Sequence, residues 1–257
     1  MAKWAAFPHP GDFQFDAAGV ARQWARLHAG DAEPLPADPA VLAAWVAFHN
    51  GDFEQAAEAG LAAGHAGYTV ANKATCIHAT YVEKREKARL DLFQLAAQRA
   101  TEHAQAEPAN ANAWYLKAIA LGRYSQGISV AKALAQGLGS RVKEALERAV
   151  ALEPRHAEAR IALGTFHAEV IDKVGSLIGG MTYGVKRETG VAMFEEALRL
   201  NPGSPIGLLE YANGLVMFDG EERVDEATRL YQRAAALPPV DAMERLQVEL
   251  ARADLQL

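Results

Sequence analysis

The sequence has a single cysteine and no long apolar run, and both absences limit what the protein can be. Cys76 is the only cysteine among 257 residues, so no disulfide can form within the chain. No uncharged apolar stretch reaches the ~18–20 residues that a membrane-spanning helix needs. Residues 1–12 lack the apolar core of ~7–15 residues that signal peptides contain. We therefore expect a cytoplasmic protein without membrane insertion.

Dense basic clusters are also missing. The net charge is −6, from 26 basic and 32 acidic residues, and the cluster at residues 84–87 includes a glutamate. Nucleic-acid binding depends on clustered Lys and Arg that neutralise phosphates, and anionic membrane surfaces attract similar patches. The sequence therefore favours neither nucleic acid nor a membrane surface as a partner, and we interpret residues 84–87 as a solvated helix face.

Strand-forming patterns are absent as well. We find no run of alternating β-branched residues bounded by turn residues. Alanine, the strongest helix former, accounts for 54 of the 257 residues, about a fifth of the chain. This composition predicts an all-α fold.

One short pattern occurs four times and predicts a helical repeat. The pattern is an amphipathic segment that ends in a proline, and it occupies residues 100–108, 145–154, 194–202 and 231–239. Proline cannot continue the hydrogen-bond ladder of a helix, so each segment marks a helix end. Units of this kind stack in series as an α-solenoid.

We therefore predict one array over residues 1–257. It has an N-terminal arm and helix in residues 1–37, about five helical hairpins in residues 38–239, and a capping helix in residues 240–257. Arrays need such a cap because the last repeat would otherwise expose its apolar face.

The first predicted hairpin resembles a tetratricopeptide repeat (TPR). Its turn reads Asn-Gly-Asp-Phe, and Gly51, Phe53, Ala56 and Ala63 stand where that repeat has small and aromatic residues. Gly60 departs from the pattern, because the repeat has an aromatic residue there. The resemblance implies a superhelix of TPR-like hairpins.

Two of the repeats are longer than the ~34 residues of a TPR unit. The spacing is 46 residues from Pro108 to Pro154 and 48 from Pro154 to Pro202. The extra residues should therefore lie between the two helices of each hairpin, in 124–139 and 174–185. Inserts often mark the binding face of an array; the alternative is that these two pack on each other as extra core. The candidate insert contacts are Ile128, Leu134, Leu177, Met181 and Tyr183.

A narrower resemblance follows from the second half of the chain. Residues 114–154, 169–186, 194–202 and 210–213 are similar to the T component associated with TRAP transporters, and the resemblance covers about residues 110–240. It implies a bacterial helical array that assists the substrate-binding protein of a carboxylate-type transporter. That family is periplasmic and lipid-anchored, whereas from residues 1–12 we expect neither a leader nor a lipid-bearing cysteine here. The eukaryotic regulator-of-microtubule-dynamics proteins have a similar repeat style.

Motifs for catalysis are incomplete. Residues 175–182 differ from a phosphate-binding loop because Met181 replaces the lysine, and no strand precedes them. Residues 127–131 approach the nucleophile elbow but end in alanine. Cys76 and His78 are two residues apart and point to different sides of a helix. No histidine has metal-ligand spacing, so we predict no catalytic residue, no cofactor, no metal and no enzyme.

In TPR arrays the first helices of successive hairpins line a concave groove. Counting each repeat from the preceding proline gives these candidate groove contacts: Asn112, Tyr115, Ile119 and Arg123 in the third hairpin, Ile161 and Thr165 in the fourth, and Leu209, Asn213 and Met217 in the fifth. They lack the row of Lys and Arg that would hold a peptide carboxylate. An extended apolar segment or a helix fits them better than an acidic tail.

Our first hypothesis is a non-catalytic scaffold or adaptor that binds a protein or peptide in this groove, with a link to a transport system. The alternative, from another class, is a carrier whose inserts enclose a small apolar or carboxylate ligand. Self-association is compatible with both.

Overall fold

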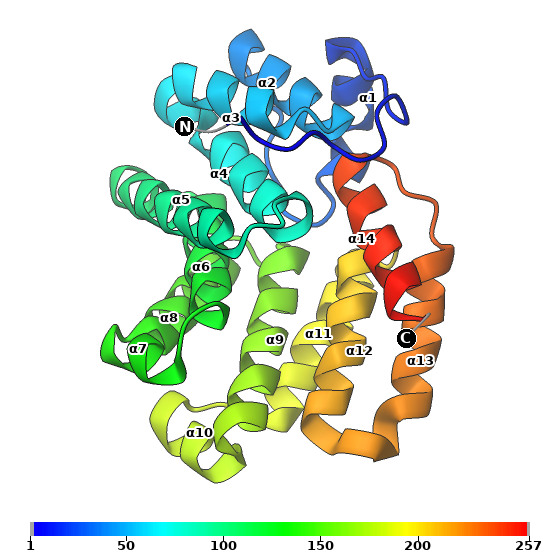
Figure 1. The fold of residues 1–257 in the computed structure, drawn as a ribbon. Helices are drawn as coiled ribbons and strands as arrows, with labels where there is room; N and C mark the ends of the chain where they lie inside the picture. Colours follow the sequence, from blue (N-terminus) through cyan, green and yellow to red (C-terminus); the bar gives the residue numbers. More distant parts are fainter. Residues whose placement is uncertain (1–2, 256–257) are drawn as a thin grey trace. The chain divides into compact units, whose positions relative to one another are not determined.

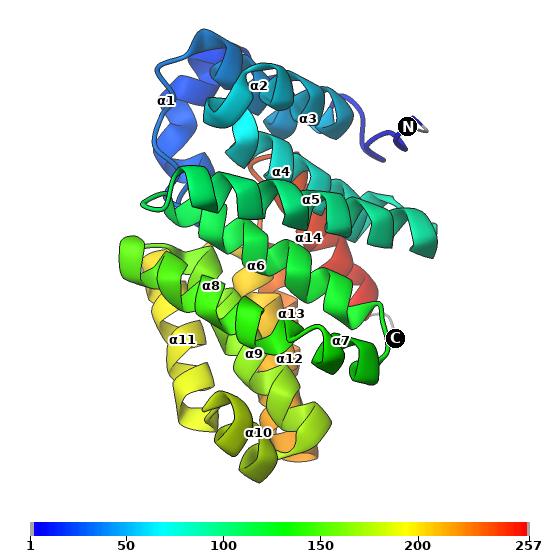
Figure 2. The same cartoon turned by 90° about the vertical axis from the view of Figure 1, so that its left-hand side faces the viewer.

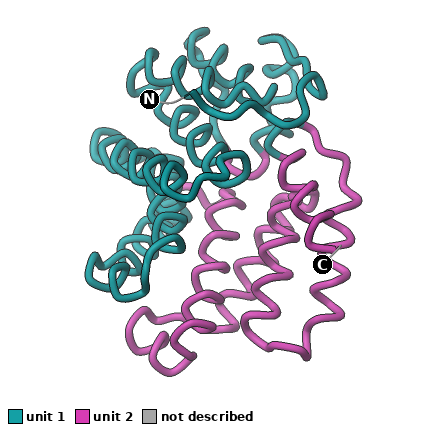
Figure 3. The backbone as a smooth tube through the Cα atoms, viewed as in Figure 1, with its two compact units in different colours: residues 1–28, 33–152, 241–243 teal, residues 29–32, 153–240, 244–257 magenta. Residues whose placement is uncertain are grey.

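The computed structural model describes residues 3–255, and within them every regular element is helical (Figure 1). This confirms the predicted all-α fold. The helices group into two compact units, shown in different colours in Figure 3. The first unit comprises residues 1–28, 33–152 and 241–243, and the second comprises residues 29–32, 153–240 and 244–257. Whether the two act as the single array that we expected stays a prediction.

The first unit holds the helix after the arm and three hairpins. Its helices are α1 (Ala17–Leu27), α2 (Pro39–Asn50), α3 (Phe53–Ala62), α4 (Tyr68–Ile77), α5 (Glu86–Ala106), α6 (Ala111–Gln126), α7 (Val130–Ala135) and α8 (Leu138–Leu152). A 3₁₀ turn, Gly64–Gly67, precedes α4, and a π-helical turn, His78–Val82, continues it.

The second unit holds two further hairpins and most of the last helix. Its helices are α9 (Ala157–Val174), α10 (Ser176–Tyr183), α11 (Arg187–Leu200), α12 (Pro205–Asp219), α13 (Val224–Ala236) and, from Glu244 onward, α14 (Ala242–Asp254). A 3₁₀ turn, Gly220–Arg223, joins α12 to α13.

The beginnings of several helices follow signals in the sequence. Asp16, Asp38, Asn110 and Ser204 each accept a hydrogen bond from a backbone N–H in the first turn of the helix that follows. This contact satisfies one of the donors that a helix start leaves unpaired. The predicted helix after Asp16 is therefore confirmed.

Prolines follow the ends of the second helices, as predicted. The helices α5, α8 and α11 end two residues before Pro108, Pro154 and Pro202, and α13 ends three residues before Pro239. Each proline follows a helix that its missing N–H could not have extended. The sequence pattern therefore located the hairpin boundaries.

The hairpins pack in series within each unit. Consecutive helices contact each other, and the first helices also meet: α2 packs on α4 and α4 on α6 in the first unit, and α9 packs on α12 in the second. Figure 2 shows α5, α6 and α8 lying side by side. Contact between the first helices of neighbouring hairpins is the arrangement that lines the binding face of a TPR array.

A close backbone approach explains why Gly60 departs from the TPR pattern. A Cβ atom on Gly60 would lie 2.7 Å from the carbonyl oxygen of Gly67, and one on Gly67 would lie 2.1 Å from that of Gly60. No side chain fits at either position without moving the backbone. The aromatic residue of the repeat is absent because a second segment of backbone occupies its place.

The second unit is centred on a phenylalanine between two glycines. Phe194 on α11 is fully buried. A Cβ atom added to Gly164 on α9 would lie 2.9 Å from the Phe194 ring. A Cβ atom added to Gly214 on α12 would lie 2.6 Å from the same ring. Ile161 and Ala197 pack in the same cluster. The two glycines thus leave room for one ring between three helices.

The second insert contains a short helix, because Ser176–Tyr183 forms α10. Gly175 and Gly184 flank it with positive φ angles of 80° and 67°, a conformation that glycine adopts without the Cβ penalty. The glycines end the short helix rather than prevent it.

The last helix buries only part of its apolar side chains. Met243 and Leu246 are buried, but Leu250 is 40% exposed. Ala251 takes its place in the cluster that joins α14 to α12 and α13. Among the described residues, we find no helix with both the length and the apolar character to cross a membrane.

Candidate functional site

The predicted contacts on α6 form one stripe whose exposure changes along the helix. Asn112 and Tyr115 are buried, with 5% and 9% of their surface exposed. Ile119 and Arg123, one and two turns further on, are half-buried. Only the second half of this stripe therefore presents side chains at the surface.

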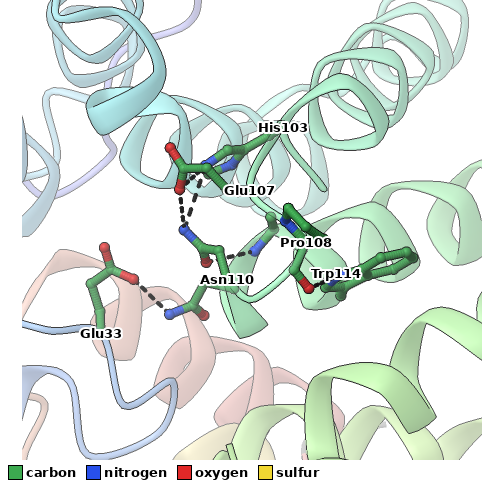
Figure 4. Close-up of polar contacts among 8 residues, drawn as sticks. Glu33, His103, Glu107, Pro108, Asn110 and Trp114 are labelled. Atoms are coloured by element: carbon green, nitrogen blue, oxygen red, sulfur yellow. Dashed lines mark hydrogen bonds and ion pairs between the residues drawn. The ribbon is translucent and has the colours of Figure 1, made fainter. Parts of the chain in front are cut away.

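A connector that precedes α2 occupies the beginning of the stripe. The Nδ2 of Asn112 donates a hydrogen bond to the carboxylate of Glu33 at 2.6 Å (Figure 4). The indole Nε1 of Trp24 donates to the backbone oxygen of Glu33 at 2.7 Å. Glu33 therefore ties α1 and α6 to the proline-rich connector, and Asn112 acts in this link.

The turn between α5 and α6 is fixed by its own polar groups (Figure 4). Asn110 donates to Glu107 at 3.0 Å and accepts from the N–H of Ala113 at 3.1 Å. His103 lies 3.2 Å from the Glu107 carboxylate, and burial lowers its pKa although that carboxylate acts in the opposite direction. Trp114 donates to the carbonyl of Pro108 at 3.1 Å. These contacts hold the turn in place through its own side chains and backbone.

In the second unit, two predicted contacts lie in the core. Ile161 and Leu209 are 4% and 2% exposed and belong to the hydrophobic clusters around α11 and around α13. Their role as partner contacts stays a prediction, but most of their surface already packs against other helices. Thr165, Asn213 and Met217 are half-buried and keep part of their surface accessible.

Those three residues, with Glu210, form a surface that we call the α9–α12 face. The hydroxyl of Thr165 on α9 donates to the Glu210 carboxylate on α12 at 3.1 Å. The hydroxyl of Tyr231 on α13 donates to Oδ1 of Asn213. Met217 lies one turn beyond Asn213 on the same helix. The face is therefore ordered by hydrogen bonds between helices and carries an apolar side chain at one end.

The insert residues mostly point into solvent. Leu134 on α7 is 56% exposed, and Leu177 and Met181 on α10 are 75% and 82% exposed. Ile128 is half-buried, and Tyr183 is half-buried with its ring 6.0 Å from that of Phe166. Side chains this exposed do not enclose a ligand. Whether the two inserts meet stays a prediction, because they belong to different units.

Cys76, which a sequence pattern suggested as a reactive group, is not a nucleophile in this fold. Cys76 is buried, and burial raises the pKa of its thiol to about 12, so the thiolate does not form near neutral pH. Within the residues that the structure describes, no three His, Cys, Asp or Glu side chains are placed to hold a metal ion.

Sequence reasoning missed Glu33 and Glu210. Glu210 lies three residues before Asn213, a spacing that places two side chains on the same helix face, so the pattern could have found it. Glu33 lies in a connector without periodicity, and no signal in the sequence assigned it to Asn112.

Three comparisons with known proteins concern the family and the fold of the chain. The family model described as "Regulator of microtubule dynamics protein 1-3" matches residues 69–255. No curated protein matches the sequence. A thermophilic TPR protein of Thermus thermophilus has a similar structure, with a TM-score of 0.58 and 15% identity over 83% of this chain and 97% of that chain.

A second TPR protein, YrrB, is described as having an unusual peptide-binding site. Its TM-score is 0.41, with 14% identity over 92% of this chain and 100% of that chain, a similarity too low to support an argument. The Thermus structure confirms the TPR part of the predicted resemblance. None of the three comparisons gives the T component of TRAP transporters.

Proposed function

The chain belongs to the family of regulator of microtubule dynamics proteins 1-3, whose model matches more than two thirds of its length, and we propose that it is a scaffold that binds a protein partner. TPR-like hairpins in series support this proposal, because such arrays present side chains from successive helices along one surface. The family description refers to microtubule dynamics, and under this proposal the chain contributes to such regulation by holding a partner, without catalysis.

The α9–α12 face is the observation that carries the proposal. Thr165, Glu210 and Asn213 are held by hydrogen bonds that join three helices, so the surface is preorganised. Preorganised side chains lose little entropy on binding. Met217 adds a flexible apolar side chain of the kind that adapts to different partners.

The chemistry of this face suggests the class of partner. Glu210 is part of this face, and Glu169 lies one turn after Thr165 on α9, where Lys173 pairs with it at 3.6 Å. An acidic tail would meet like charge there. An extended apolar segment or a helix, neutral or basic in charge, fits better.

We also propose that the chain is not catalytic, because the catalytic motifs are incomplete and Cys76 is buried. The proposed link to a transport system rests on the sequence resemblance of about residues 110–240.

A pair of matched substitutions tests the α9–α12 face. We expect Met217→Glu to reduce retention of a stoichiometric partner by about tenfold or more, because an unpaired carboxylate buried in an interface costs more than the ~1.4 kcal/mol that a tenfold change represents. The measurement is quantitative mass spectrometry of proteins retained from host extract by the immobilised chain.

Met181→Glu is the control, since that side chain is 82% exposed on α10. It should leave retention unchanged. Equal retention by wild type and Met217→Glu would reject the face as the contact surface, and loss with Met181→Glu alone would place the contact on the insert. Native mass spectrometry of the purified chain would reveal a retained small molecule only if the carrier hypothesis holds.

A further inference from the structure

Residues 3–15, which we call the arm, run without helix along the first hairpins (Figure 1). The arm is fixed at three positions, Trp4, Phe7 and Phe15, all within the first unit. Its contacts are those of a bound extended peptide: aromatic side chains in defined seats and backbone groups paired with side chains of the helices.

The first seat lies between α3 and the π-helical turn. The ring of Trp4 stacks on the imidazole of His78, with centroids 4.4 Å apart and an interplanar angle of 21°. The backbone N–H of Trp4 donates to the carboxylate of Glu54 at 3.0 Å. One aromatic ring and one backbone donor are therefore recognised together.

The second seat is the turn between α2 and α3. A Cβ atom on Gly51 would lie 2.6 Å from the ring of Phe7, and Phe53 meets that ring edge-on with centroids 6.1 Å apart. Gly51 has a φ of 92°, which favours glycine for a second reason. Phe7 is 8% exposed, so its ring fills the space above the turn.

Beyond these seats the arm leaves the hairpin and returns. Residues 8–12 form a turn with Gly11 at a φ of 87°. Asn50 then holds the backbone of Phe15 from both sides, accepting from its N–H at 2.7 Å and donating to its carbonyl at 3.0 Å. A pocket of 430 Å³ lies between this clamp and the turn. Residues 3–7 and Phe15 are therefore held by separate sets of contacts.

In the first seat, the arm leaves the polar atoms of His78 without hydrogen bonds. His78 is fully buried, yet neither ring nitrogen has a hydrogen-bond partner within residues 3–255. A buried polar group without a partner keeps the full cost of its removal from water. Occupation of this seat by Trp4 thus leaves a cost that release, or an occupant with a polar atom near His78, would remove.

The charge around the seats favours a basic occupant. The charged groups that act on His78 are the carboxylates of Glu83 and Glu54 and the guanidinium of Arg85, so carboxylates outnumber cations at the first seat. Asp52, Glu54 and Glu58 lie on or beside α3. In the arm, Lys3 precedes Trp4. Charge complementarity of this kind selects partners and speeds their association.

We propose that the surface formed by Gly51, Glu54 and His78 is a binding site for an extended segment in which a basic residue precedes two aromatic residues three positions apart, and that the arm occupies this site until such a segment displaces it. The site is separate from the α9–α12 face, so the two proposals can fail independently. A tethered arm competes at an effective concentration on the order of millimolar, so the site is available only to segments that bind more tightly than the arm or after its release.

The test uses a fluorescent, acetylated peptide with the sequence of residues 3–8, Lys-Trp-Ala-Ala-Phe-Pro, and the full chain. Fluorescence anisotropy should show at least about tenfold tighter binding to the double variant Trp4→Ala/Phe7→Ala than to the wild type, because the double variant no longer fills its own seats. Glu54→Gln added to that variant should weaken binding severalfold, and a peptide with Glu in place of Lys should bind more weakly.

A second measurement needs no variant. Unlabelled peptide in excess should accelerate hydrogen exchange at the arm amides of the wild-type chain, since displacement breaks the bond from the Trp4 N–H to Glu54. Equal affinity for wild type and double variant, equal binding of a peptide with Ala for both aromatic residues, or unchanged exchange of the arm would each overturn the proposal.

Discussion

The helices around Phe194 and the helix α4 are packed by opposite means. Phe194 sits between glycines on two neighbouring helices in an apolar cluster. The helix α4 and its π-helical turn instead bury a series of polar residues: Thr69, Asn72, Lys73, Thr75 and His78. Neither side-chain atom of Asn72 and neither ring nitrogen of His78 has a hydrogen-bond partner in the part of the chain that the structure describes.

The difference shows which part of the packing a repeat pattern in the sequence predicts and which part it does not. Small and aromatic residues encode how closely helices approach, and Phe194 with Gly164 and Gly214 is packed in this way. Buried polar groups carry no periodic signal, and those without a hydrogen-bond partner reduce stability. A protein keeps such groups where they serve another purpose, and we locate that purpose in the region around α4, which also receives the arm.

The largest expected effect concerns Phe194. We predict that Phe194→Ala lowers the free energy of unfolding by about 3–5 kcal/mol, because the cavity would lie between three helices that cannot collapse onto it. Urea unfolding followed by far-UV circular dichroism measures this. Phe13→Ala, in the half-buried part of the arm, should cost far less; similar losses for both would break the comparison.

The second largest change in the free energy of unfolding should come from the glycines that pack against Phe194. A methyl group on Gly214 would meet the Phe194 ring at 2.6 Å, and we predict that Gly214→Ala costs about 1–3 kcal/mol through overpacking. Gly122→Ala is the matched control on α6, where a Cβ atom meets nothing within 4 Å. It should gain up to about 1 kcal/mol from helix propensity. Changes in stability of the same sign at both positions would contradict the close packing of Gly214 against Phe194.

The polar core should respond in the opposite sense to an apolar substitution. We predict that Asn72→Leu raises the free energy of unfolding by about 1 kcal/mol, because it removes buried polar atoms that lack partners and keeps a similar volume. The same urea experiment applies. A loss of stability would mean that Asn72 has a bound partner in solution, and the contrast with the core around Phe194 would disappear.

A smaller, pH-dependent effect should come from His78. Burial lowers its pKa below the usual 6.5; the carboxylates of Glu83 and Glu54 oppose this shift and Arg85 adds to it. The unfolded chain therefore binds more protons between the lowered pKa and 6.5, so stability rises with pH in that window and is lost as the pH falls through it.

The variant His78→Gln should show a shallower loss of stability on acidification below pH 6.5. Thermal unfolding at a series of pH values measures it. Burial also lowers the pKa of His103, so part of the acid sensitivity should persist. Identical pH profiles for wild type and variant would exclude His78 as a source.

The smallest expected effect is at the insert. Met181 is 82% exposed, and we predict that Met181→Ser changes the free energy of unfolding by less than about 0.5 kcal/mol, as is usual for exposed positions. A loss above about 1 kcal/mol would show that α10 packs as extra core, which is the alternative we left open for the inserts.

Much of the fold could be predicted from the sequence because its signals are local. Prolines 108, 154 and 202 end helices through their own covalent structure, and Asp16 caps a helix through its own side chain. The stripe on α6 was also predicted from spacing. Its partial burial was not, since the residue that covers Asn112 is Glu33, 79 positions earlier.

The sequence by itself determined the helical hairpins, because caps, prolines and apolar spacing act within a few residues of one another. Only the tertiary structure decided which predicted groove residues are accessible and where the arm lies. Those outcomes depend on contacts such as Trp4 with His78 and Phe7 with Gly51. The segments involved are far apart in the chain, and burial of one depends on the position of the other, so no local pattern could specify them.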